Sequence, residues 1–127
     1  MIYDLTSYCD ITKVVNDNLY AADKGIKVKQ VNCDDKKLYM LNYIRSKLTE
    51  GNVDSLGLFR SVITDGINIL CFSPPKSIKI LNFINNLNYK DVKMEEFIEG
   101  TMINLFYYNN TWMCSTKGTI GAKCKFF

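Results

Sequence analysis

The sequence predicts an α+β fold in which antiparallel β-hairpins pack with two or three short helices. Two hairpin signatures lie in the C-terminal half, where an Asp-Gly pair and an Asn-Asn pair each separate β-rich runs. The N-terminal half instead places apolar residues near helical stripes. We therefore expect one domain, or part of one, with residues 1–54 mainly helical and residues 55–127 β-rich.

The N-terminal part is expected to contain the helices. Residues 34–49, "DDKKLYMLNYIRSKLT", have apolar residues near one stripe, Asp34 as a capping residue and Gly51 as a stop signal. A second helix is expected within residues 9–21.

Residues 57–73 are expected to form the first hairpin, with Asp65-Gly66 as its turn. A pair of prolines ends the second strand, and "KSIKILNFINNL" at 76–87 then predicts a short helix. The apolar residues of that helix that we expect to face inward are Ile80, Leu81, Ile84 and Leu87.

The second hairpin should pair strands 96–108 and 111–117 across Asn109-Asn110, because asparagine tolerates the positive φ angles of a tight turn. A turn centred there places Lys117 opposite Met102. A last strand is expected to run through "AKCKFF". Its terminal aromatic pair needs cover, so we expect the domain to continue beyond this sequence or a further chain or subunit to pack on that strand.

The composition is that of one globular domain. The 127 residues are 47% hydrophobic and 23% charged. No apolar run approaches the roughly 18 residues of a membrane span, and the N-terminus does not resemble a signal peptide, so no membrane partner is expected. The five cysteines include no CxxC pair, which favours free thiols in the reducing cytoplasm.

The chain has no histidine, which excludes Ser-His-Asp catalysis, Cys-His catalysis and histidine-ligated zinc. Residues 101–127 also contain no acid, and their bases are Lys117, Lys123 and Lys125. This segment is either a solvated strand face or a local positive field for phosphates.

Three stretches in order, "LFRSVI", "ILCFSPPKSIKILNF" and "FIEGTMINLFYYNNTWMCSTKGTIGA", carry a resemblance over about residues 55–123. Together they resemble the N-terminal half of the nucleotidyltransferase domain, an ATP-grasp-like ligase fold, of ATP-dependent RNA ligases of the phage RNA ligase 1 type. They also resemble ligase-like proteins of large DNA viruses. The resemblance implies ATP and Mg²⁺ as cofactors, although the sequence itself requires neither, and a nucleotide or an RNA end as partner.

The resemblance also implies five nucleotide-binding residues. Glu99 matches the motif carboxylate that addresses the ribose, Gly100 the motif glycine and Thr101 the small hydroxyl residue after it. Arg60 matches an arginine that contacts the nucleotide or the acceptor end, and Lys117 matches a phosphate-binding lysine. The alternative for each charged residue is structural: a rim ion pair for Arg60, and a solvated position for Glu99 and Lys117.

The departure from the family is Phe97, which occupies the position of the nucleophilic lysine and cannot form a lysyl-AMP. Lys93 lies about 13 Å away along an extended strand, and Lys76 could take part only through tertiary placement. No acid follows Glu99 to hold Mg²⁺, so no metal ligand and no certain catalytic residue is predicted. The chain lacks the family's later motifs as well, so whether it is an enzyme stays open.

Four functions remain. The first is a degenerate or partial RNA-ligase-like nucleotidyltransferase domain that binds a nucleotide or RNA end without forming a lysyl-AMP. The second is a non-enzymatic structural or protein-interaction domain, viral by the resemblance, that kept the fold. A capping-type guanylyltransferase fits less well, because Thr101 and Met102 stand where that group usually has an arginine. A plain nucleic-acid-binding module would need more than two arginines and clustered bases.

Overall fold

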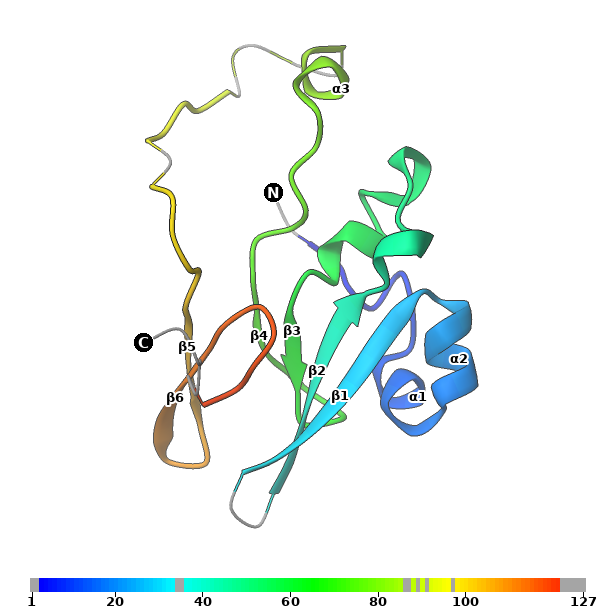
Figure 1. Ribbon diagram of the computed structural model, residues 1–127, viewed down its shortest axis with the longest axis vertical. Coiled ribbons are helices and arrows are strands. Elements are labelled where there is room, and N and C mark those ends of the chain that lie inside the picture. Colours follow the sequence, from blue (N-terminus) through cyan, green and yellow to red (C-terminus); the bar gives the residue numbers. More distant parts are fainter. Residues whose placement is uncertain are drawn as a thin grey trace.

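The computed structural model describes residues 3–33, 36–85, 88, 90, 92–96 and 98–121. It is an α+β structure, as the sequence predicts, built on a four-stranded antiparallel sheet in the order β1-β2-β3-β4 with a separate hairpin β5-β6 (Figure 1). The strands are β1 (Ile26–Cys33), β2 (Lys36–Tyr43), β3 (Val62–Thr64), β4 (Ile69–Phe72), β5 (Asn104–Tyr108) and β6 (Thr111–Ser115). The α-helices are α1 (Ile11–Asn16), α2 (Asn18–Asp23) and α3 (Ile80–Asn85), and the 3-10 helices are η1 (Arg45–Lys47), η2 (Glu50–Asn52) and η3 (Leu56–Leu58).

Two short helices cover one face of the sheet. Asp10 caps α1 by accepting a hydrogen bond from the Lys13 amide, and Asp17 caps α2 by accepting from the amides of Leu19 and Tyr20. Their buried side chains join a core cluster with the sheet residues of that face, and the largest members are Phe59, Ile26, Leu41 and Leu56. The helix expected within residues 9–21 is thus found as two helices joined at Asp17.

The prediction of a helix over residues 34–49 is wrong. Residues 36–43 form β2, and the short 3-10 helix η1 follows. Every residue of β2 pairs with β1, from Lys36 with Cys33 to Tyr43 with Ile26. Leu38 and Met40 are buried on one face and Leu41 on the other. A strand covered on both faces has a continuous apolar run, which periodicity cannot distinguish from a buried helix. Residues 1–54 are consequently not mainly helical, because β1 and β2 are each longer than α1 or α2.

The first predicted hairpin is present as β3 and β4, although its strands are shorter than expected. Asp65 holds the connecting loop, because its Oδ1 accepts hydrogen bonds from the amides of Ile67 (2.9 Å) and Asn68 (2.7 Å). Gly66 has a φ of 101°, which a side-chain-bearing residue would adopt only with strain. Arg60 lies in the turn before β3 and not within a strand, which corrects its expected position.

The second predicted hairpin is confirmed in its turn and its register, but its strands are shorter than the expected 96–108 and 111–117, since β5 begins at Asn104 and β6 ends at Ser115. Asn109 and Asn110 have φ angles of 51° and 59°, and the pairs run from Tyr108 with Thr111 to Asn104 with Ser115. This ribbon covers the sheet face opposite the helices, where Phe106 joins Leu38, Met40, Ile63 and Ile120 in a second core cluster. The strand expected through 122–127 lies outside the described residues.

Helix α3 forms as predicted, but its apolar residues do not face inward. Ile80 and Leu81 are 71% and 70% exposed, and Ile84 is exposed as well, while Leu87 lies outside the described residues. An apolar stripe predicts that a helix packs against another part of a protein, but it does not identify that part. Within the described part of the chain, no helix has the length and apolar content needed to cross a bilayer.

Candidate functional site

A basic hollow of about 300 Å³ lies at the end of β2, where several loops meet. Four cationic side chains, one amide and one aromatic ring line it: Arg45, Arg60, Lys76, Lys117, Asn42 and Tyr43. These residues come from four separate parts of the chain, so the fold is what brings the four positive charges together.

Asn42 fixes the two sides of the hollow relative to each other. Its Nδ2 donates one hydrogen bond to the carbonyl oxygen of Arg60 at 2.7 Å and another to that of Lys117 at 3.0 Å. A side-chain amide has two donor hydrogens, and both are used here. The backbone segments that carry Arg60 and Lys117 are therefore both attached to β2.

Lys117 is held in a tight turn that follows β6. The amide of Thr116 donates to the carbonyl of Thr119 at 2.9 Å, and Ser115 bridges to Ile120. The Lys117 ammonium lies 5.6 Å from the centroid of the Tyr43 ring, a cation–π distance. This turn directs Lys117 to the hollow and not toward Met102, because strand pairing ends at Asn104 with Ser115.

Lys76 reaches the hollow because its backbone is anchored to η3. Its amide donates to the carbonyl of Gly57 at 3.0 Å, and its ammonium donates to the backbone and hydroxyl oxygens of Ser77, both at 3.0 Å. A Cβ atom on Gly57 would lie 3.3 Å from Val53 and 3.4 Å from the Lys76 Cβ. Glycine at position 57 thus permits the close approach of the segment that carries Lys76.

The residues that line the hollow are cationic or neutral. No carboxylate is among the residues that line it, and the two ion pairs in the described part of the chain join other residues, Lys79 to Glu50 and Lys93 to Glu95. Four cations around one concave surface create a positive potential that favours an anion with several oxygens. Phosphate is the biological group that fits this description best.

Two of the five residues predicted from the resemblance, Arg60 and Lys117, line the same hollow. The other three, Glu99, Gly100 and Thr101, are exposed in the irregular segment that leads into β5 and do not line it. A Cβ on Gly100 would meet no atom within 4 Å, so no close backbone approach explains this glycine. Phe97 lies outside the described residues.

Comparison with protein-family models, with curated proteins and with solved structures finds no significant match to this chain. Its function must therefore be inferred from its own residues.

Four residues of the hollow, Asn42, Tyr43, Arg45 and Lys76, did not emerge as site residues from the sequence. Arg45 was expected on a helix, and Asn42 carried no signal beyond its place in an apolar run. Lys76 was considered only as a displaced nucleophile, because nothing local to the sequence places it beside Arg60. The convergence of these side chains depends on tertiary contacts of β2 and η3 that no short motif encodes.

Of the two cofactors that the resemblance implies, ATP fits the hollow better than Mg²⁺ does. The four cations suit the phosphates of a nucleotide. Magnesium is held through carboxylates, and none lines the hollow; nor does the described part of the chain contain a group of three histidines, cysteines or acids suited to a metal. The residues that line the hollow therefore suit the phosphates of a nucleotide better than they suit the metal.

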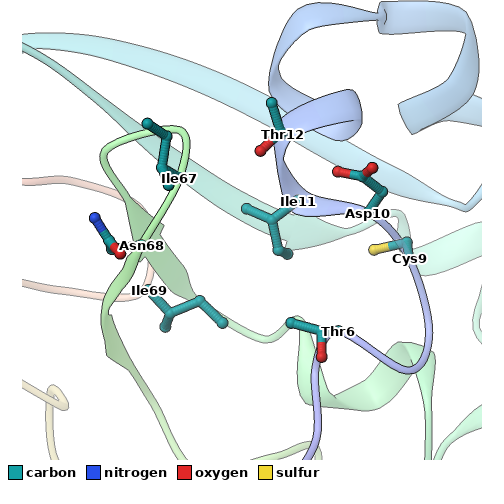
Figure 2. Close-up of a pocket in the computed structure, with 8 residues that line it drawn as sticks. All are labelled: Thr6, Cys9, Asp10, Ile11, Thr12, Ile67, Asn68 and Ile69. Carbon is teal, nitrogen blue, oxygen red and sulfur yellow. The ribbon is translucent and has the colours of Figure 1, made fainter.

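A second hollow, of about 560 Å³, lies between the start of α1 and the loop after β3 (Figure 2). Asp10 is the one charged residue that lines it, and its carboxylate already caps α1. Burial raises the pKa of the Cys9 thiol to about 11, which keeps that sulfur protonated and poorly nucleophilic at neutral pH. This hollow is thus suited neither to phosphate nor to thiol chemistry.

Proposed function

We propose that this chain is a degenerate or partial RNA-ligase-like nucleotidyltransferase domain that binds the phosphate of a nucleotide or an RNA end in the basic hollow. The observation that carries the proposal is the pair of hydrogen bonds by which Asn42 holds the Arg60 and Lys117 segments around one hollow without acids. The resemblance assigned phosphate or nucleotide contacts to the same two residues.

The proposed binding is electrostatic and preorganised. Each guanidinium offers two parallel donors to a phosphate, while each lysine acts as a mobile point charge. The volume of about 300 Å³ lies at the lower limit of small-molecule sites, which suits one or two phosphate groups with a ribose and leaves the base at the rim.

The proposal includes no covalent step. The family's nucleophile position holds Phe97, and the Lys76 ammonium donates its hydrogen bonds to Ser77. We therefore expect reversible binding and no lysyl-AMP.

Calorimetric titration with AMP and ATP in the absence of Mg²⁺ tests the proposal. Arg60→Ala and Lys117→Ala should each weaken binding about ten- to a hundredfold, the loss expected for one charge-assisted phosphate contact. The matched control is Lys13→Ala on α1, which removes a positive charge that does not line the hollow and should leave affinity within about twofold. Absent binding by the wild type, or equal effects of all three variants, would refute the proposal.

A protein-interaction domain is the second candidate, and one observation favours it. Helix α3 exposes Ile80, Leu81, Phe83 and Ile84 together, and exposed apolar groups of this kind often mark a binding surface. Analytical ultracentrifugation of wild-type and Leu81→Ser chains would test it, since an interaction through α3 between copies would be weakened by the serine.

A further inference from the structure

The two faces of the β5-β6 hairpin differ sharply in burial. Phe106 on the inner face is 4% exposed, whereas Leu105, Tyr107 and Trp112 on the outer face are 64%, 56% and 65% exposed. Alternation along a strand places these three residues on one face, because Tyr107 pairs directly with Trp112. The hairpin needs only its inner face to hold it on the sheet, so the outer aromatic rings are not explained by packing.

The aromatic rings of the outer face are arranged so that a further ring can join them. Tyr107 and Trp112 meet edge to face, with ring centroids 5.4 Å apart and planes at 63°. In an edge-to-face pair, the edge of one ring contacts one face of the other. The remaining ring faces can therefore stack with a third planar group.

Lysines flank the hairpin on the side of the sheet that it covers. Strands β1, β2, β5 and β6 and the turn through residue 121 contain no acid, and alternation places Lys27, Lys29 and Lys36, all exposed, on that side; the sequence between β1 and β2 adds Asp34 and Asp35. Two of these lysines border the hairpin: the Lys36 ammonium lies 5.4 Å from the Tyr108 ring centroid, and that of Lys29 donates to the Gly118 carbonyl at 3.1 Å. Exposed aromatic rings among lysines suit a polyanion that carries planar bases.

The outer face and the basic hollow lie on one continuous strand and turn. Trp112 begins this stretch and Lys117 ends it, five residues later, so their backbones are at most about 17 Å apart, the length of five extended residues. A single strand of a few nucleotides could span this distance with its terminal phosphate in the hollow and its following bases on the hairpin. A duplex could not, because its bases are already stacked and their faces are hidden.

We infer that the outer face of β5-β6 is a stacking platform for unpaired bases of a single-stranded RNA whose terminal phosphate occupies the basic hollow. This inference rests on the proposed function and adds the surface on which the unpaired bases next to the bound phosphate would stack. Tyr107 and Trp112 receive the bases, and Lys29 and Lys36, which border the hairpin, attract the phosphates.

Trp112 is the only tryptophan of the chain, so its fluorescence reports directly on the platform. The full chain is titrated with a 5′-phosphorylated oligouridylate of about ten nucleotides, within the usual site size for such surfaces. We expect quenching of Trp112 and binding about tenfold or more tighter than that of inorganic pyrophosphate, which should fill the hollow without quenching. Blunt duplex RNA of equal length should not quench.

Tyr107→Leu keeps an apolar side chain in the strand but removes the ring, and it should weaken oligonucleotide binding about tenfold while leaving pyrophosphate binding unchanged. Leu19→Ala, which alters an exposed apolar residue on α2, is the control and should change neither. Trp112→Phe should retain affinity, measured by anisotropy of a labelled oligonucleotide.

The outcomes separate the two claims. Oligonucleotide that binds no tighter than pyrophosphate and leaves Trp112 unquenched would overturn the platform and leave phosphate binding in place. Quenching by the oligonucleotide without any binding of pyrophosphate or AMP would support the platform and overturn the phosphate site.

Discussion

The helix-covered face of the sheet and the region of the hairpin and the basic hollow use their charged and aromatic residues in opposite ways. On the helix-covered face, acids serve local structure, as Asp10 and Asp17 cap α1 and α2, and the rings of Tyr8 and Phe59 pack together at 5.7 Å between centroids. At the end of β2, cations surround a hollow that no acid lines, and on the outer face of the hairpin the rings of Tyr107 and Trp112 are exposed. Both sheet faces contain buried core clusters, so both contribute to stability, and we propose that binding belongs to the hollow and the outer face of the hairpin.

The largest expected effect comes from breaking the helix-covered face. Phe59 is fully buried in its core cluster, and Phe59→Ala should lower the free energy of unfolding by about 3–5 kcal/mol, because it leaves a cavity. Urea denaturation measures this loss. Phe72→Ala at the sheet edge, where the residue is 42% exposed, is the matched control, and an equal loss there would contradict core burial of Phe59 as the source of the effect.

The next effect concerns the connection between the sheet and the hollow. Asn42→Ala removes both hydrogen bonds to the Arg60 and Lys117 carbonyls, so it should cost about 1–3 kcal/mol of stability and weaken AMP binding about tenfold. Calorimetry and urea denaturation of the same sample measure both quantities. Asn32→Ala on β1 serves as control, and unchanged AMP affinity in Asn42→Ala would show that Asn42 does not organise the site.

A smaller effect is expected at the β3-β4 loop, and it depends on pH. Burial opposes ionisation of Asp65, but hydrogen bonds from Asn68 and Ile67 outweigh it and lower the pKa of the carboxyl. A lowered folded-state pKa gives stability that is present above the unfolded pKa and is lost as the pH falls through the folded pKa. Asp65→Ala should therefore cost about 1 kcal/mol at pH 7 and less at pH 3, as measured by denaturation at the two pH values. A difference that stays equal at both would contradict this role.

The smallest effect is expected in the segment before β5. Glu99 is exposed and does not line the basic hollow, so Glu99→Gln should change AMP affinity by less than about twofold. The resemblance to RNA ligases instead assigns Glu99 to the ribose. A tenfold loss in calorimetry would show that this segment moves onto the ligand and would place Glu99 in the site.

The sequence predicted those elements whose signals are local. Asn109 and Asn110 adopt positive φ angles, and Asp65 caps its own loop, so both hairpins could be predicted from a few neighbouring residues. Strand β2 could not, because burial of Leu41 on one face and of Leu38 and Met40 on the other removes the alternation that marks a strand.

The same distinction applies to the site. Arg60 and Lys117 belong to short motifs and could be predicted as candidates, whereas Asn42 and Lys76 join them at the hollow only through contacts between distant segments. Gly57 is the sequence feature that permits one such contact, because its missing side chain makes room for Lys76. A glycine alone does not identify the segment that packs against it, so this contact could not be predicted from the sequence. Periodicity also could not predict that Ile80 and Leu81 on α3 are exposed. It identifies an apolar stripe on a helix but not whether another element packs against that stripe.

The central claim is that the basic hollow binds phosphate, and amide chemical-shift mapping of the ¹⁵N-labelled chain with AMP tests it most directly. We expect the largest shifts at the side-chain amide of Asn42 and at the backbone amides of Arg60, Lys76 and Lys117, with α1 and α2 unchanged. Saturable shifts confined to α1 and the loop after β3, around Cys9, or no shifts at millimolar AMP, would contradict the claim.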